Sequence, residues 1–263
     1  MFITNTEKVI MKEWEQEREL LKQQLKKLGN LEGHFLELTV HPEIYDRDRF
    51  GGKRCLQERV IDSRFIPADY WYFPLPEDLN YDGLKSDFEN DCLTYVIDDV
   101  MFGITTSGLF CYQVQCSTEY DKPEKRLLIL FVEMAFRTIH SAVKFMSKFY
   151  GSLNPSSSIR IFSTIFDTYN RLPTQDIFRP FDKPIGFYTD KLIDDSRICF
   201  DLTTTRQEIS SNPINVVFKL MKNFVSSISA NMSDEQLLSL IERIDAGDTL
   251  AFRHNTSLKK SHL

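Results

Sequence analysis

The stretch from Pro123 to Tyr150 has the most extended helical apolar pattern of this chain. Its apolar residues recur at intervals of three and four and leave only a narrow polar strip. A band this wide predicts a helix that is buried over most of its circumference. We therefore expect a helix that lies across a sheet and ends at Gly151. The members of the band are Leu128, Phe131, Val132, Ala135, Ile139, Ala142, Met146 and Phe149.

Segments on both sides of this helix have the patterns of strands. Some alternate between apolar and polar residues, and others are short apolar runs bounded by turn residues. A Ser-Gly pair at Ser107 and Gly108 marks a turn between two of them. The expected strands are 34–41, 94–103, 108–116, 159–166 and 198–202, with an acidic loop over 77–91 and an irregular region over 170–192.

Two further helices are expected near the C-terminus. Asn212 and Pro213 have the residue types preferred at the cap and the first position of a helix, and Ser233 with Gln236 forms a capping box. The order of elements shows no strict alternation of strand and helix. The predicted fold class is α+β: a mixed, mostly antiparallel sheet, with a long buried helix and the C-terminal helices packed on one of its faces.

Residues 6–28 predict an amphipathic helix that is charged over most of its surface. Two interpretations remain open: the helix packs on its own domain, or it serves as a linker or partner-binding helix. Its stripe spans about three heptads, the lower limit for a coiled coil. The second interpretation makes a protein partner contact Trp14, Leu21, Leu25 and Leu28, together with Trp71 in the aromatic stretch 70–73.

This pattern divides the chain into three parts: a charged helix over 1–30, one globular domain over 31–245 and a flexible tail over 246–263. The five cysteines show no paired metal-binding spacing, and no apolar run approaches the length of a membrane span. We expect free thiols, a cytoplasmic protein, no cofactor and no membrane attachment, with oligomer formation left open.

Net charge argues against a broad nucleic-acid surface, because the chain carries −6 and phosphate binding favours excess lysine and arginine. One local exception is the segment from Arg47 to Arg54. There Arg47, Arg49, Lys53 and Arg54 surround two glycines, so the segment is a candidate for anion or nucleic-acid binding, or else a solvated loop.

The sequence provides no constellation that identifies a catalytic site. The histidines lack metal-binding spacing, and no serine lies in a nucleophile elbow. A metal-dependent nuclease centred on Asp98 or Asp99 stays a second alternative, although the next strand lacks the Glu-x-Lys that such enzymes use. We assign no catalytic and no metal-ligating residue, and we expect a protein that is not an enzyme.

The order of features over about three quarters of the chain resembles the C-terminal region of bacterial Schlafen-AlbA-type DNA- or ATP-binding proteins. The segments that carry the resemblance are LELTVHPEIYDRDRF (36–50), YWYFP (70–74), FGITTSGLFCYQV (102–114) and SIRIFSTIFDTYNRLP (158–173). The chain departs from the family where a charged helix replaces the nucleic-acid-binding module, and Trp71 lies two residues before Phe73. The resemblance implies a non-catalytic sensor or assembly domain of a bacterial protein, in phage defence.

Overall fold

The fold is taken from a computed structural model. It describes residues 5–29, 35–66, 73–75, 80, 84–97, 100–122, 125–169, 172–174, 193–228 and 232–246.

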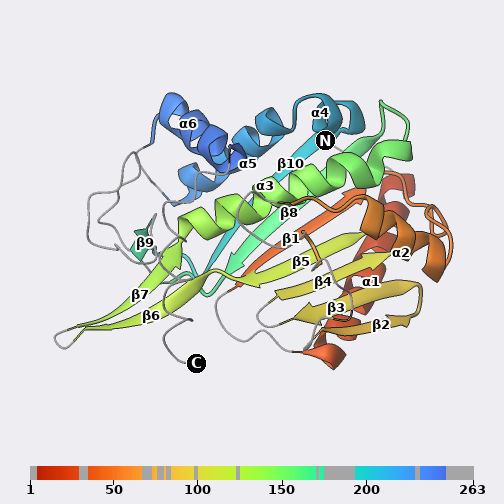
Figure 1. The fold of residues 1–263 in the computed structure, drawn as a ribbon, viewed down its shortest axis with the longest axis horizontal. Coiled ribbons are helices and arrows are strands. Elements are labelled where there is room, and N and C mark those ends of the chain that lie inside the picture. Colours follow the sequence, from red (N-terminus) through yellow and green to blue (C-terminus); the bar gives the residue numbers. More distant parts are fainter. Residues whose placement is uncertain are drawn as a thin grey trace.

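A seven-stranded sheet forms the centre of the molecule, and all of its strand pairs are antiparallel (Figure 1). Its order is β10-β8-β1-β5-β4-β3-β2, so β10 and β2 are the edges. The strands are β1 (Phe35–Pro42), β2 (Lys85–Glu89), β3 (Cys92–Ile97), β4 (Val100–Thr105), β5 (Phe110–Gln115), β8 (Ser158–Phe166) and β10 (Arg197–Thr205). This arrangement confirms the predicted α+β class.

Most of the helices cover one face of this sheet, and the long helix α3 crosses it diagonally (Figure 1). The helices are α2 (Lys53–Asp62), α3 (Val132–Phe149), η1 (Tyr150–Ser152), α4 (Arg206–Ser211), α5 (Pro213–Ser227) and α6 (Asp234–Asp245). Asn212 and Ser233 cap α5 and α6 as the sequence predicts. Residues of alternate positions on the strands, such as Leu38, Phe102 and Phe110, meet α3 in the main core.

Helix α1 (Asn5–Leu28) lies on the opposite face and covers only part of it (Figure 1). It packs against β2, β3 and β4, where Trp14, Leu21 and Leu25 join a second apolar cluster with Val96 and Met101. A glycine permits this contact: a β-carbon on Gly103 would lie 2.7 Å from Cδ1 of Leu21. The long helix and the C-terminal helices pack on one face as expected, and the apolar stripe of α1 is buried on the other face.

The predicted helix over 123–150 was wrong in its first part. Residues Lys125–Phe131 form strand β7, which pairs with β6 (Ser117–Lys122) and, in parallel, with β9 (Leu172–Thr174). The helix begins at Val132. The run from Leu127 to Phe131 is apolar at every position, so it fits a strand as well as a buried helix, and periodicity does not separate the two.

Two more expectations needed correction. The strand expected over 94–103 is two strands, β3 and β4, which pair with each other. The acidic segment expected as a loop contains strand β2, whose side chains are mostly exposed. A polar edge strand has little apolar signal, because only one of its sides pairs and neither of its faces is deeply buried.

Candidate functional site

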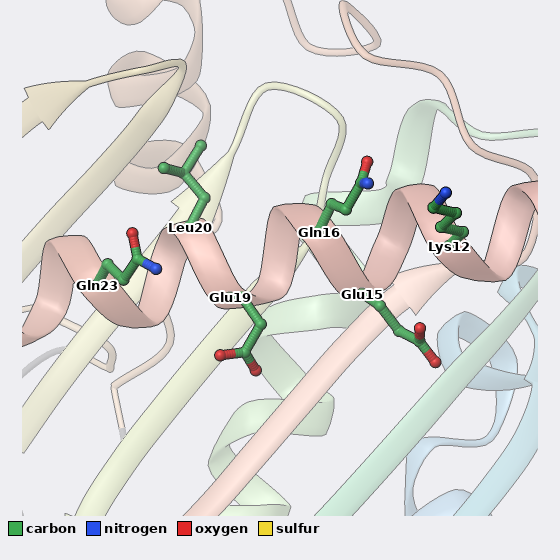
Figure 2. Close-up of a pocket in the computed structure, with 6 residues that line it drawn as sticks. All are labelled: Lys12, Glu15, Gln16, Glu19, Leu20 and Gln23. Atoms are coloured by element: carbon green, nitrogen blue, oxygen red, sulfur yellow. The ribbon is translucent and has the colours of Figure 1, made fainter.

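A shallow pocket lies on the outer side of α1, away from the sheet (Figure 2). Its lining comes from one helix alone: Lys12, Glu15, Gln16, Glu19, Leu20 and Gln23. Glu15 and Glu19 leave the helix on one side, and Gln16 and Leu20 on the other (Figure 2). These are the solvated residues of an amphipathic helix, and their arrangement brings no nucleophile next to a base. The pocket therefore indicates no chemistry of its own.

A buried carboxylate fixes α1 to the centre of the sheet. Oε1 of Glu37, on β1, lies 2.7 Å from Nη2 of Arg18 and 2.9 Å from Nζ of Lys22. Its other oxygen accepts a hydrogen bond of 2.8 Å from Nε2 of Gln113. Burial raises the pKa of Glu37, but Lys22 and Arg18 together outweigh it, so the net pKa lies below the ordinary value. Glu37 is thus an ionised clamp between helix and sheet.

Beyond this clamp, none of the helices that the structure describes covers the rest of the same sheet face. We call it the open half-face. In the register of β1, β8 and β10 its side chains form rows, such as Phe35–Phe166–Arg197 and Thr39–Phe162–Asp201, of which Thr39 is buried. Its residues are Phe35, Ser158, Arg160, Phe162, Thr164, Phe166, Arg197, Cys199, Asp201, Thr203 and Thr205, all of them partly or fully exposed.

Aromatic rings are paired on the open half-face. Phe35 and Phe166 stack with their centroids 4.7 Å apart, and the guanidinium of Arg197 lies 5.4 Å from the Phe166 centroid. Further along, Phe162 stacks on His41, which in turn packs 4.4 Å from Trp14 of α1. Burial lowers the pKa of His41 to about 4, so its ring is neutral at pH 7. The rings are therefore held in fixed positions at the surface.

The composition of the open half-face differs from that of an ordinary solvated surface. Its eleven residues are three phenylalanines, two arginines, three threonines and one each of serine, cysteine and aspartate, with neither lysine nor glutamate among them. The outer side of α1, by contrast, presents Lys12, Glu15 and Glu19. Protein–protein interfaces are enriched in aromatic residues and arginine and depleted in lysine, glutamate, aspartate and serine. The phenylalanines, the arginines and the lack of lysine fit this composition, whereas Asp201 and Ser158 do not. By this criterion the open half-face has the character of a contact surface.

A second carboxylate, partly buried, lies at the other flank of α1. Oε2 of Glu17 accepts a hydrogen bond of 2.7 Å from Oγ of Ser107, which is 2.8 Å from Oγ1 of Thr105. Burial raises the pKa of Glu17, and the two hydroxyls only partly compensate. Ser107 is fully buried, so its hydroxyl anchors α1 to the turn after β4 and is not accessible to a substrate.

Within the part of the chain that the structure describes, an imidazole–carboxylate pair joins α3 to α6. Nε2 of His140 lies 2.8 Å from Oδ1 of Asp245, which is also 2.7 Å from Nζ of Lys144. Burial lowers the pKa of His140, although Asp245 opposes this. The pair lies at the end of α6 and fixes that helix on α3.

The four cations of the predicted anion site do not converge. Arg47 pairs with Asp91 at 2.9 Å, Arg54 pairs with Glu58 at 2.8 Å, and Arg49 donates to the carbonyl of Ile44. Lys53 lies 5.7 Å from the ring centroid of Phe88. Each of the four side chains contacts another residue of the chain, and no two of them contact the same residue.

Of the predicted partner-binding residues, Trp14, Leu21 and Leu25 are buried against the sheet, at 5%, 0% and 1% exposure, and Leu28 packs on the same cluster. The helix therefore packs on its own domain, which is the first of the two interpretations. A partner cannot reach these side chains while α1 stays in place. Trp71, Asp98, Asp99 and the tail beyond residue 246 lie outside the described residues.

The open half-face was not among the predicted sites, although the sequence contains a signal for it. In β8 and β10 every second side chain faces the core, and most of these are apolar, with Ser163 and Thr204 as exceptions. The residues between them include Phe162, Phe166 and Arg197. Aromatic residues that recur at the solvent-facing positions of an alternating strand indicate an interaction surface. Only the strand order, however, shows that these positions adjoin Phe35 of β1.

Within the ranges given above, no cluster of three or more histidine, cysteine, aspartate or glutamate side chains has the arrangement of a metal site. None of the described helices combines the length and the apolar character needed to span a bilayer. Comparisons with protein-family models, with curated proteins and with solved structures gave no match to this chain.

Proposed function

We propose that this chain is a non-catalytic interaction domain that binds a protein partner on its open half-face. The observation that carries the proposal is the uneven covering of the sheet. One face is packed under α2, α3 and α5, and α1 covers part of the other, which leaves aromatic and arginine side chains of β1, β8 and β10 at the surface.

Order in the surface supports this assignment. The stacks Phe35–Phe166 and Phe162–His41 fix the rings before any partner arrives, so binding costs little side-chain entropy. Arg160 is likewise held, because its Nη2 lies 3.2 Å from Oε1 of Glu43. Preordered aromatic and arginine side chains are typical of the residues that dominate binding energy in protein interfaces.

Charge favours a protein over a nucleic acid as the partner. Asp201 lies beside Phe162 in the middle of the open half-face, and Glu15 and Glu19 project from the flank of α1 that also carries Arg18 and Lys22. A phosphate backbone near these carboxylates would be repelled, whereas a protein can present arginine or lysine to them. The Schlafen-AlbA resemblance adds the expectation of a bacterial assembly in phage defence as the setting.

The experiment is affinity capture from the cells that make the protein, with three forms of the full chain. Thr164→Arg places a long charged side chain in the middle of the open half-face. Ser226→Arg is the matched control, because Ser226 is an exposed position of α5, remote from that face. We expect the wild type and Ser226→Arg to retain the same protein, and Thr164→Arg to lose it while unfolding at the same temperature.

Equal capture by all three forms would overturn the assignment of the surface. Single-stranded DNA and RNA are tested in parallel at low salt. If binding weakens steeply with salt and is lost in Arg160→Gln or Arg197→Gln, the partner is a nucleic acid and not a protein.

A further inference from the structure

The two edges of the large sheet differ in how they are protected. Edge strand β2 has five residues, three of them charged (Lys85, Asp87 and Glu89), and Glu89 pairs with Lys27 of α1. Edge strand β10 has nine residues and contains neither lysine nor proline. Its register with β8 runs without a bulge from Arg197 to Thr205. Short length, charge, proline and bulges are the devices that prevent edge pairing, and β10 has few of them.

The backbone of β10 presents every second residue to the outside. The carbonyl of Ser196 accepts a hydrogen bond from the amide of Thr168, just beyond β8. The backbone N–H and C=O groups of the even-numbered residues of β10 therefore point toward β8. In an antiparallel strand the N–H and C=O groups alternate in direction from one residue to the next. Odd-numbered residues such as Cys199 therefore point their backbone groups away from the sheet. Their side chains belong to the open half-face.

The charges on these odd positions are self-complementary. Arg197 and Asp201 lie two residues on either side of Cys199, and all three are exposed. If a second β10 runs antiparallel about a two-fold axis at Cys199, each Arg197 faces the Asp201 of the other copy. A parallel arrangement in register would instead place like charges opposite each other, which destabilises a strand pair. A two-fold interface requires this kind of self-complementarity.

From these observations we infer that two copies of this chain associate through β10, antiparallel and centred on Cys199, so that their sheets become continuous. The interface goes beyond the partner surface proposed above, because it uses backbone groups of the edge and needs no other protein. It also joins the two open half-faces side by side.

One side chain competes with this pairing. Nδ2 of Asn223, on α5, donates a hydrogen bond of 3.0 Å to the carbonyl of Asp201. In the dimer that carbonyl accepts from the amide of Arg197 of the other copy, so Asn223 has to release it. Asn223→Ala removes the competing donor and strengthens the dimer.

The affinity test uses sedimentation velocity of the purified full chain over a range of concentrations. Arg197→Asp and Asp201→Arg each turn two attractive cross-strand pairs into repulsive ones, which we expect to weaken the dimer roughly tenfold. The double variant Arg197→Asp with Asp201→Arg restores the complementarity and the dimer. A wild type that is monomeric at every concentration, or a double variant as weak as the single ones, would overturn the inference.

The register test uses oxidation with copper–phenanthroline in a Cys55→Ser background, because Cys55 and Cys199 are the two exposed cysteines. Cα atoms of a hydrogen-bonded antiparallel pair lie about 5.5 Å apart, within the range of a disulfide. We expect a covalent dimer through Cys199. The matched control moves the thiol, in Cys199→Ser with Thr203→Cys. There the two thiols lie eight residues apart, roughly 26 Å at about 3.3 Å per residue. Equal cross-linking by both forms would contradict the register.

Discussion

Glu37 and Arg18 form a salt bridge of 2.7 Å across the interface between β1 and α1, and the Glu37 side chain is almost completely buried. Lys22 contacts the same oxygen, and Gln113 binds the other. A carboxylate in this position is stable only with its partners, because an unpaired buried charge is costly. The position of α1 on the sheet therefore depends on a residue of the central strands as well as on its own apolar stripe.

We expect Glu37→Gln to lower the free energy of unfolding by about 2 kcal/mol, as measured by urea denaturation. Removal of one partner of a buried pair costs about 3–5 kcal/mol. The loss should be smaller here, because Arg18 and Lys22 are partly exposed and can turn toward water.

Its control is Glu89→Gln on β2, which breaks the exposed pair between Glu89 and Lys27 of α1. Exposed pairs contribute little to stability, so this variant should unfold at the same urea concentration as the wild type. Similar losses in the two variants would mean that burial of Glu37 is not what makes the clamp effective.

Glu37, which is buried, and Glu17, which is partly buried, should make stability depend on pH in opposite directions. The pKa of Glu37 is lowered in the fold, so its stabilisation is present above its unfolded pKa, about 4.3, and is lost as the pH falls below that value. The pKa of Glu17 is raised, so its contribution is greatest below about 4.3 and is lost as the pH rises through its folded pKa. Urea denaturation from pH 3 to 7 measures both.

Each glutamine variant should remove one of these slopes. The difference between wild type and Glu37→Gln should shrink toward acid, and the difference between wild type and Glu17→Gln should become more favourable to the wild type toward acid. Two difference curves that slope in the same direction with pH would contradict the assignment of the two environments.

Gly103 should tolerate no side chain while Leu21 remains. A β-carbon there would lie 2.7 Å from Cδ1 and 3.1 Å from Cγ of Leu21, so α1 or the leucine must move. We expect Gly103→Ala to cost about 1–3 kcal/mol, the usual range for overpacking. Gly151→Ala is the control, because its β-carbon would meet nothing closer than 4.0 Å.

A double-mutant cycle identifies the cause. Leu21→Ala alone leaves a cavity, but in combination with Gly103→Ala the new methyl group partly fills it. The cost of the double variant should therefore be less than the sum of the single costs. Additive costs would show that Leu21 is not what excludes a side chain from position 103.

Local signals predicted the ends of elements better than their assembly. The caps at Asn212 and Ser233 involve neighbours in sequence, and both lie where the sequence places them. Strand β7 could not be assigned in this way, because its residues 127–131 are apolar at every position and so fit both periods, and its state depends on pairing with β6.

Prediction of the open half-face would have required information about contacts even further apart in the sequence. That Phe35 adjoins Phe166, more than a hundred residues away, follows from the strand order, which no local pattern contains. For the same reason the sequence left two fates open for Trp14. Its stripe predicts a helix with an apolar side, but only the tertiary fold shows that His41 and Val96 lie beneath it.

His41 should make stability depend on pH between about 4 and 6.5. Its pKa is lowered by burial to about 4, whereas the unfolded histidine titrates near 6.5. Over this interval the unfolded chain binds more protons than the folded chain, so stability falls as the pH falls. His41→Gln removes the imidazole from the stack between Trp14 and Phe162 and should flatten this part of the curve.

His140 contributes a slope of the same sign, because burial lowers its pKa as well, and that slope should survive in His41→Gln and diminish in His140→Gln. If the curve of His41→Gln runs parallel to that of the wild type from pH 4 to 6.5, the imidazole is not held neutral between the two rings.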